Sequence, residues 1–213
     1  FRRVLFRSDE TPNAFATGRD PKHAAVAVTT GLLATMEERQ LIGVLAHELS
    51  HVRNRDTLVG TIAATIGGAI SFLAQMGQWS LLFGGGSDEE GGTHPGLALL
   101  GIILAPIAAL VIQLAVSRGR EYLADSTGAS LTGDPEGLAQ ALERLGAHQE
   151  RHGLLGRLRG RQAEPATNPA FGHLWIVSPL SGSSLSGLFS THPPLPARIA
   201  RLRSMRITES TRG

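Results

Sequence analysis

Residues 45–51 read Leu45-Ala46-His47-Glu48-Leu49-Ser50-His51 and lie inside an apolar run that extends from Leu41 to Val52. The run has helical periodicity, and residues four apart on a helix share one face. His47 and His51 can therefore direct two imidazole nitrogens to one point, as zinc requires, which binds neutral histidine nitrogen at about 2.0–2.1 Å. Glu48 is rotated away from that point and can reach a water that the metal activates, as a general base must.

The alternative for this stretch is a surface helix that carries two solvated histidines. The neighbouring side chains oppose it, because they make the helix largely apolar: Leu41, Ile42, Val44, Leu45, Leu49 and Val52. Buried histidine and glutamate side chains need partners. A metal ion would supply them.

Glu121 and Asp125 are candidates for completing such a site. They stand four residues apart in Glu121-Tyr122-Leu123-Ala124-Asp125, so they share one face of a helix. One carboxylate can bind the metal while the other accepts a hydrogen bond from the second N–H of a ligand histidine. A pair with this spacing is common in isolation. Beside a His-Glu-x-x-His motif that lacks a third histidine, the pair becomes the best source of a third ligand.

The composition excludes several other classes of site. The chain of 213 residues is long enough for one domain with a sizeable core. It contains no cysteine, so a zinc ion would have to be held by histidine and carboxylate. The net charge of +2 is too small to indicate a nucleic-acid partner.

The first eight residues look foreign to the rest of the chain. They read Phe1-Arg2-Arg3-Val4-Leu5-Phe6-Arg7-Ser8, which matches one reading frame of a common sequencing-library adapter. We expect residues 1–8 to be a scar outside the fold, and the natural amino terminus to be missing. The alternative is a genuine basic tail.

Two short apolar segments before the histidine motif predict a β-hairpin. Ala14–Ala16 and Ala24–Thr29 are separated by turn residues, and we expect them to pair antiparallel. Thr35 is the predicted N-cap of a helix from about Glu37 to Asn54. A strand beside a zinc helix can offer its edge to a substrate peptide; a purely structural hairpin is the equal alternative.

Two uncharged segments follow the histidine motif. Residues 57–87 contain no Asp, Glu, Lys or Arg, and Leu58–Met76 can cross a bilayer core at about 1.5 Å per residue. Pro95–Val116 is the second uncharged segment, and the loop between the two is rich in glycine and acidic residues. Because the outer flanks are basic, the pattern predicts a transmembrane hairpin with both ends in the cytoplasm. The alternative is a helical hairpin buried in a soluble domain.

The rest of the chain predicts further helices and loops. Asp134 and Pro135 begin an amphipathic helix whose apolar residues recur at helical spacing and indicate core positions: Leu138, Ala141, Leu142 and Leu145. Residues 150–164 and 181–190 are expected to be loops, and residues 174–177 a short buried strand or turn. A last amphipathic helix is expected over Pro196–Met205.

Four features, in this order, resemble the HtpX-type membrane zinc metalloproteases, which are bacterial relatives of the CAAX prenyl proteases. They are His47-Glu48-Leu49-Ser50-His51, the uncharged hairpin, Ser117-Arg118-Gly119-Arg120-Glu121-Tyr122-Leu123-Ala124-Asp125 and Thr191-His192-Pro193-Pro194. The resemblance covers about Pro12–Leu202. It implies a mainly α fold with a small β-sheet, in which a transmembrane helical hairpin interrupts a zincin-like (gluzincin) metalloprotease domain. It also implies two membrane helices upstream of this sequence.

The predicted layout has five parts. After the scar come the zinc-helix half of the protease domain (9–56), the membrane hairpin (57–116), the second half of the protease domain (117–205) and a tail (206–213).

The resemblance also implies roles for individual residues. One zinc ion per chain would be bound by His47, His51 and Glu121, with Glu48 as the catalytic acid/base, and Asp125 is a candidate for orienting a ligand histidine. Two further candidates, as donors to the oxyanion of the substrate, come from the segment that the resemblance places near the cleft: His192 and Arg198. The alternative for His192 is a structural role in a proline-rich turn.

The implied activity is hydrolysis of peptide bonds in damaged or misfolded membrane proteins, a stress-response function. The implied location is the bacterial cytoplasmic membrane, with a multi-pass chain and the active site on the cytoplasmic side. The expected partners are protein and peptide substrates and the lipid bilayer, without nucleic acid. Two alternatives stay open: a soluble zinc peptidase with a buried hairpin, and a catalytically inactive membrane scaffold.

Overall fold

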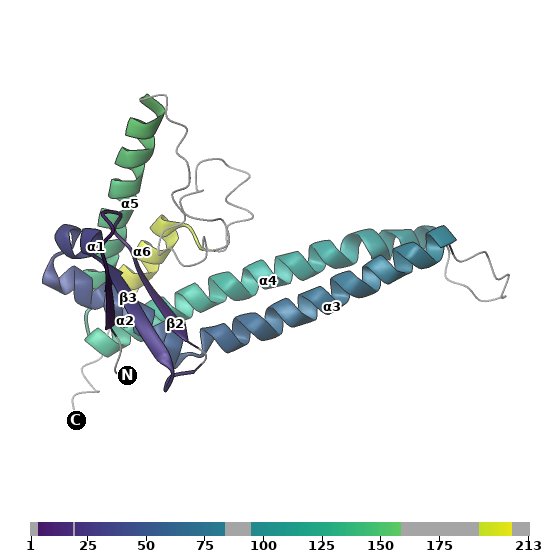
Figure 1. Ribbon diagram of the computed structural model, residues 1–213, viewed down its shortest axis with the longest axis horizontal. Helices are drawn as coiled ribbons and strands as arrows, with labels where there is room; N and C mark the ends of the chain where they lie inside the picture. The colour runs from purple at the N-terminus through teal and green to yellow at the C-terminus, as the bar shows by residue number, and fades with distance from the viewer. Residues whose placement is uncertain (1–3, 19, 84–94, 159–191, 206–213) are drawn as a thin grey trace. The chain divides into compact units, whose positions relative to one another are not determined.

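The computed structural model describes residues 4–18, 20–83, 95–158 and 192–205. These residues are mostly helical and form one small sheet (Figure 1), which confirms the predicted mainly α fold. The elements are β1 (Val4–Arg7), β2 (Ala14–Gly18), β3 (Ala24–Thr29), α1 (Thr30–Thr35), α2 (Glu38–Arg53), α3 (Asp56–Phe83), α4 (Pro95–Thr132), α5 (Pro135–Leu158) and α6 (Leu195–Ser204). The chain divides into two compact units, the first of Phe1–Thr57 with Arg118–Gly213, and the second, here the hairpin unit, of Leu58–Ser117.

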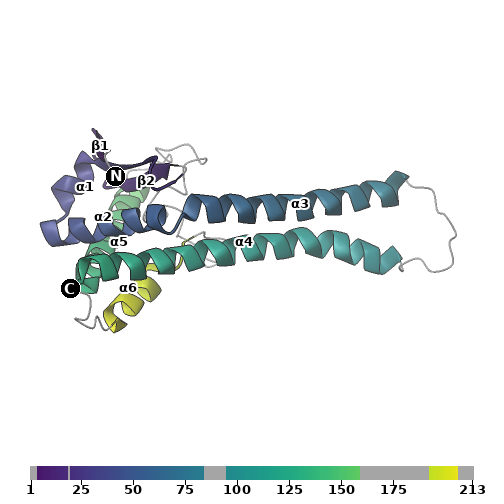
Figure 2. The same ribbon diagram turned by 90° about the horizontal axis from the view of Figure 1, so that it is seen from below.

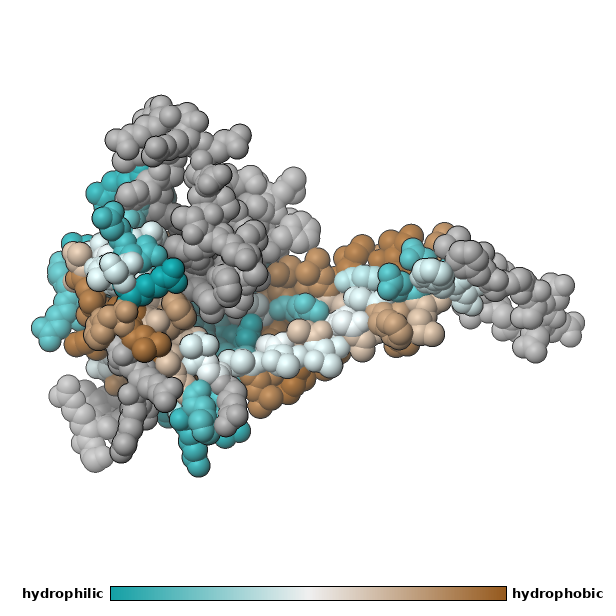
Figure 3. All heavy atoms as spheres, in the orientation of Figure 1, coloured by the Kyte–Doolittle hydropathy of each residue, from teal (hydrophilic) through white to brown (hydrophobic). Residues whose placement is uncertain are grey.

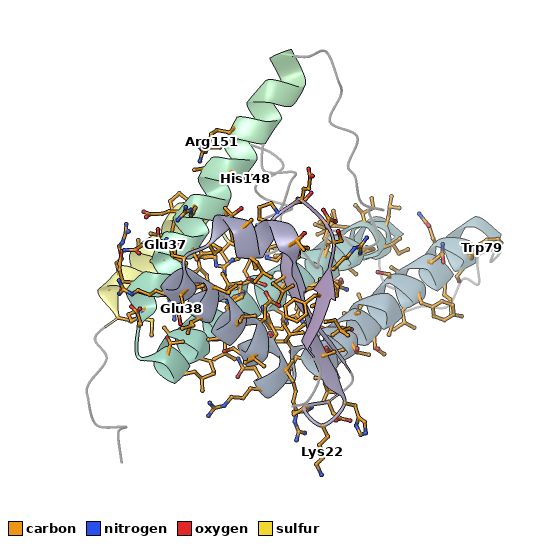
Figure 4. All side chains as sticks on the ribbon, turned by 60° about the vertical axis from the view of Figure 1, so that its left-hand side comes forward. Lys22, Glu37, Glu38, Trp79, His148 and Arg151 are labelled. Atoms are coloured by element: carbon orange, nitrogen blue, oxygen red, sulfur yellow. The ribbon has the colours of Figure 1, made fainter. Side chains whose placement is uncertain are left out.

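The sheet of the first unit has the strand order β1-β3-β2. β2 pairs antiparallel with β3, with Ala14 opposite Val28 and Gly18 opposite Ala24, so the predicted hairpin is confirmed. The turn between them is closed by the Asp20 carboxylate, which accepts hydrogen bonds from the backbone N–H groups of Lys22 and His23. Lys22 lies at the tip of this turn (Figure 4).

β1 differs from the expectation that residues 1–8 stand outside the fold. Val4–Arg7 pair parallel with β3, with Val4 opposite Val26 and Arg7 opposite Thr29. The unpaired backbone groups of a sheet edge can accept any extended segment, and β1 buries little, since the side chain of Phe6 is 72% exposed. The side chains of residues 5–7 are all exposed, so they gave no alternating burial pattern from which the strand could be predicted.

The start of α2 also differs from the prediction. Thr35 is not its N-cap, because Thr35 ends the short helix α1, where its hydroxyl donates to the carbonyl of Gly31 at 2.7 Å. α2 is capped by Glu37, which forms a capping box with Gln40. The helix then runs over Glu38–Arg53, within one residue of the predicted bounds.

The core of the first unit lies among the sheet, α2, α5 and α6. The helices α2 and α5 approach closely at Gly43, where a Cβ would lie 2.8 Å from the backbone nitrogen of Leu138. At the rim of this contact, Arg144 donates to Glu37 at 2.9 Å, and Glu37 lies at the start of α2 beside α5 (Figure 4). The four predicted core positions of α5 are all buried, as is Leu202 of the predicted last helix: Leu138, Ala141, Leu142, Leu145 and Leu202.

α5 is longer than predicted, because residues 150–158 continue the helix to Leu158 instead of forming a loop. Arg, Gln, Glu and Leu are good helix formers, and in this stretch they outweigh Gly153 and Gly156. His148 and Arg151 lie on this outer part of α5 (Figure 4). The loops expected at 84–93, 159–164 and 181–190, and the strand or turn at 174–177, lie outside the described residues.

In the hairpin unit, α3 and α4 run side by side (Figures 1 and 2). Two alanines of this unit are buried, Ala74 on α3 and Ala109 on α4. At Gly67 the amide of Gln113 occupies the space of a side chain, because a Cβ there would lie 1.7 Å from its Nε2. Small residues let helix backbones approach one another and are typical of helix contacts in membranes.

Exposed hydrophobic side chains lie along both helices of the hairpin unit, with less hydrophobic residues among them (Figure 3). Asp56–Ser80 and Leu99–Thr132 are each long and apolar enough to cross a membrane, and only 11% and 6% of their most apolar stretches are buried. A core helix of a soluble domain would bury these side chains. Their exposure in the described residues argues against the alternative of a buried hairpin.

Candidate metal centre

α2 presents the histidine motif to the interior of the first unit. His47 is 1% exposed and Glu48 is 6% exposed, whereas His51 is half-buried one turn later. The predicted helix geometry places both imidazoles on one face, with the two Nε2 atoms 3.1 Å apart. The alternative of two solvated histidines on a surface helix does not agree with this burial.

α4 contributes Glu121 and Asp125, both buried, to the same point. The two helices can approach there because of Gly128, where a Cβ would lie 3.0 Å from the backbone nitrogen of His47 and 3.1 Å from its Cα. Real side chains rarely pack this closely against a backbone. Gly128 thus sets the distance between the two ligand-bearing helices.

Replacing Gly128 by alanine is expected to destabilise the protein by about 1–3 kcal/mol, because the new methyl group must push α4 away from α2. Chemical unfolding of the detergent-solubilised protein measures the loss. Gly119→Ala on the same helix is the matched control, since a Cβ at Gly119 meets nothing within 4 Å. There alanine should stabilise the helix by about 0.5–1 kcal/mol. Equal stability of the two variants would contradict the close approach.

Three side chains have the separations that a tetrahedral metal site needs. Besides the 3.1 Å between the histidine nitrogens, Glu121 Oε2 lies 3.7 Å from His47 Nε2 and Glu121 Oε1 lies 3.8 Å from His51 Nε2. Ligand atoms about 2.0–2.2 Å from a tetrahedral zinc ion lie roughly 3.3–3.6 Å from one another. One ligand atom from each of His47, His51 and Glu121 lies within 4.8 Å of the other two, so small side-chain adjustments would bring the three atoms around a zinc ion.

The protonation pattern of the imidazoles also favours a cation. Nδ1 of His51 lies 2.6 Å from Asp56 Oδ2, and Nδ1 of His47 lies 3.0 Å from Asp125 Oδ1. Carboxylates in these positions hold the ring proton on Nδ1, so the two Nε2 atoms face each other with lone pairs. The Glu121 carboxylate is buried beside them, with Nη1 of Arg198 3.3 Å from its Oε2. A divalent cation among these atoms would be bound by both imidazoles and by the carboxylate.

Asp56 is a carboxylate that the motifs did not point to. It is 6% exposed and forms the first residue of α3. Its position five residues after His51, as the last charged residue before the uncharged segment, was the only signal in the sequence.

α6 and the residues before it bring His192 and Arg198 to the same place. Arg198 is 1% exposed and donates from Nε and Nη2 to Asp125, at 2.8 and 2.6 Å. Its Nη1 lies 3.3 Å from Glu121 Oε2, and His192 Nδ1 lies 3.3 Å from Glu121 Oε1. All of the predicted site residues thus surround Glu121 and the two motif histidines.

Glu48 lies beside the cluster and contacts the sheet. The backbone N–H of Ala16 in β2 donates to its Oε2 at 2.9 Å. Burial raises the pKa of the Glu48 carboxyl above its usual range, although the charges of His47 and His51 oppose the rise. A raised pKa suits a group that must take up and release a proton near neutral pH.

The pKa values of the other titratable groups at the site are shifted by burial and by neighbouring charges. Burial lowers the pKa of His51, but the hydrogen bond to Asp56 and the nearby carboxylates outweigh it and raise the value to about 9. Burial raises the pKa of Asp125, but the hydrogen bonds and charge of Arg198 bring it down to about 2. The pKa of Glu121 is also lowered, since His192 and Arg198 outweigh its burial. A cation at Nε2 would replace the proton that His51 otherwise holds.

Two imidazoles and a glutamate around one point, with a second glutamate beside them, are the arrangement of a metallopeptidase centre. The family model for Peptidase family M48 matches residues 1–206. The chain therefore belongs to peptidase family M48.

Relatives in this family carry the name that the sequence resemblance suggested. The chain is 56% identical to a protease HtpX homolog of Desulforapulum autotrophicum, over 94% of this chain and 62% of that protein. It is 52% identical to a homolog from Syntrophotalea carbinolica and 48% identical to protease HtpX of Legionella pneumophila, each over 70% of the relative. The predicted resemblance is confirmed, and the chain spans about three fifths of the length of the first relative.

A solved structure has a similar fold. The crystal structure of S. mikatae Ste24p matches 95% of this chain and 46% of its own chain, with a TM-score of 0.56 and 18% sequence identity. At this identity the likeness concerns the fold alone. It agrees with the mainly helical architecture and the small sheet described above.

Proposed function

We propose that the chain is a membrane-anchored zinc endopeptidase, with one zinc ion bound by His47, His51 and Glu121. The observation that carries the proposal is the cluster of His47, His51 and Glu121, in which one ligand atom from each side chain lies within 4.8 Å of the other two. Membership in peptidase family M48 supports the same reaction. In its finer class the fold would then be zincin-like, of the gluzincin type, with the glutamate ligand on a second helix.

Glu48 is the general acid/base of the proposed reaction. A zinc ion in this site supplies Lewis-acid polarisation of the scissile carbonyl and lowers the pKa of a coordinated water. Glu48 accepts the proton of the attacking water on its carboxylate and returns it to the leaving amine nitrogen. The bond between the carbonyl carbon and the amine nitrogen breaks. The hydrogen bond from the backbone of Ala16 keeps the Glu48 carboxylate in place during both transfers.

His192 and Arg198 were both predicted as donors to the oxyanion, and we assign them different roles. His192 is the better candidate for a donor to the substrate, because its side chain retains 11% exposure beside Glu121. Arg198, at 1% exposure, directs its guanidinium to Asp125 and Glu121. We assign Arg198 to positioning of these two carboxylates, and Asp125 to orientation of His47.

The hairpin anchors the peptidase in the proposed layout. Residues 9–56 and 117–205 form the two halves of the peptidase domain, residues 57–116 the membrane hairpin and residues 206–213 a tail. Residues 1–8 are a proposed scar, of which Val4–Arg7 pair with the sheet as β1. Arginines flank the hairpin at 53, 55, 118 and 120, which supports a cytoplasmic position for both ends and for the metal centre, in a bacterial inner membrane.

The hairpin predicts that the protein stays with membranes under conditions that strip peripheral proteins. Native membranes treated with alkaline carbonate should retain the chain in the pellet, because the exposed apolar surface of α3 and α4 remains in the lipid. Immunoblots of pellet and supernatant measure the partition. Release into the supernatant would remove the membrane part of the proposal and leave a soluble zinc peptidase.

Metal analysis tests the proposed ligands. The purified protein should contain about one zinc ion per chain, and His51→Ala and Glu121→Ala should each lose it, because two remaining ligands bind zinc too weakly. A chelator should stop cleavage of casein and added zinc should restore it. Glu150→Ala, an exposed glutamate on α5, is the control and should retain zinc. Unchanged zinc in Glu121→Ala would move the third ligand elsewhere.

The proposed substrates are damaged or misfolded membrane proteins, in a stress response. The similarity to the HtpX proteases supports this proposal. The edge strand β2 also lies next to Glu48, in a position where an extended substrate peptide would add to the sheet. An inactive membrane scaffold is the competing function. The intact Glu48 beside the cluster opposes it.

A further inference from the structure

We propose that Asp56 is a positioning residue of the metal centre, whose carboxylate holds His51 in the tautomer and ring orientation that metal binding requires. The proposal rests on the zinc-peptidase function proposed above. It adds to that function a residue outside both the histidine motif and the Glu121–Asp125 pair.

The contact between the two side chains is short and shielded. Asp56 Oδ2 lies 2.6 Å from His51 Nδ1, and Asp56 is 6% exposed. An acceptor at Nδ1 keeps the proton on that nitrogen, so that Nε2 presents its lone pair toward Glu121, 3.8 Å away. The contact thus fixes which nitrogen is available to a metal.

The backbone between the two residues leaves the helical path over Asn54 and Arg55. α2 ends at Arg53, and Arg55 adopts a left-handed conformation with φ +56°. For a residue other than glycine this conformation costs about 1–2 kcal/mol. Across this break the first residue of α3, Asp56, contacts His51 in the last turn of α2. Strain of this kind persists where the surrounding contacts stabilise the strained conformation.

Arg120 holds Asp56 from the other ligand-bearing helix. Its Nη1 donates to the backbone carbonyl of Asp56 at 2.7 Å. Arg120 directly precedes Glu121, the proposed third ligand, on α4. The same turn of α4 therefore supplies one ligand and anchors the residue that orients another.

The arrangement repeats the one around the first motif histidine. His47 has Asp125 at its Nδ1, and Asp125 is in turn held by Arg198. His51 has Asp56 at its Nδ1, and Asp56 is held by Arg120. Each histidine of the motif thus has its own carboxylate; Arg198 binds the carboxylate of Asp125, whereas Arg120 binds the backbone carbonyl of Asp56.

A purely structural role for Asp56 would be to stabilise the start of α3, since a carboxylate in the first turn favours a helix. Asp134 has that role at α5, where its Oδ1 accepts from the backbone N–H of Gly137 at 3.1 Å and its carboxylate pairs with Arg39. None of these contacts reaches a proposed ligand. Asp134→Asn is therefore the matched control.

The test compares zinc affinity of the full chain in detergent, by competition with a chromophoric chelator. Asp56→Asn is expected to bind zinc about 10–100-fold more weakly than the wild type, because an amide can donate to Nδ1 and favour the tautomer with its proton on Nε2. The visible absorption spectrum of the cobalt-substituted protein should shift as well. Asp134→Asn should lose some thermal stability and leave both zinc affinity and spectrum unchanged.

The outcomes separate this proposal from the function on which it rests. Failure of the wild type to bind zinc would overturn the proposed function. Tight binding by the wild type with equal affinity in Asp56→Asn would overturn the role of Asp56 alone. If Asp56→Asn does not fold, Arg120→Met replaces it, with an expected loss of about 2–10-fold in zinc affinity. Unchanged affinity in that variant would overturn the proposal equally.

Discussion

Glu48→Gln is expected to lower the rate of peptide hydrolysis by about 10²–10⁴-fold while zinc content stays at the wild-type level. Glutamine has the size of glutamate and keeps an oxygen that can accept from the N–H of Ala16, so the fold around β2 should persist. It cannot take a proton from water at neutral pH. Casein cleavage and metal analysis on the same preparation measure the two quantities.

Glu38→Gln is the matched control for this variant. Glu38 lies on the same helix as Glu48, ten residues or almost three turns earlier, and is exposed at the start of α2 (Figure 4). Its replacement should leave cleavage unchanged. Equal activity of wild type and Glu48→Gln would exclude Glu48 as the general base, and inactive wild-type protein with bound zinc would favour the scaffold function.

Arg198→Met is expected to cause the largest loss of stability, about 3–5 kcal/mol. The substitution keeps much of the apolar length of the side chain but leaves Asp125 and Glu121 buried without their guanidinium partner. An uncompensated buried charge is far more costly than a missing surface pair. The unfolding free energy in detergent, from urea titration, measures the loss.

Arg203→Met on the same helix provides the comparison. Arg203 also meets two carboxylates, Glu136 and Glu143, at 2.8–3.1 Å, but the three side chains are exposed to solvent. Water replaces lost partners at the surface, so stability should change little. Equal losses of unfolding free energy in the two variants would contradict the claim that burial makes the Arg198 contacts more important for stability than the exposed Arg203 contacts.

The elements predicted best were those whose periodicity and spacing are local. The helix over Glu38–Arg53, the hairpin of β2 with β3 and the core positions of α5 follow from patterns within about twenty residues. Glu121 could be linked to the histidines only through the missing third histidine and the family resemblance. The structure then brings it within 3.8 Å of both.

Other features depend on contacts that no local pattern encodes. The N-cap of α2 is Glu37 rather than the predicted Thr35, because Thr35 is the last residue of the six-residue helix α1. β1 depends on an open sheet edge rather than on its own side chains. Asp56 contacts His51 across a break in the helix at which Arg55 has a left-handed φ, a conformation that glycine adopts most readily. The need for glycine at position 128 follows only from the close approach of the His47 backbone, which the sequence does not reveal.

The burial of so many acids around two imidazoles ties catalysis to folding. Asp56, Glu48, Glu121 and Asp125 all lie below 9% exposure at one place, with the guanidinium of Arg198 among them. Arg198 and the His51 proton offset part of this negative charge, and a divalent ion bound only by the folded chain would add to its stability, so ion binding and folding are linked. Scarcity of zinc would then lower the stability of this protein as well as its turnover.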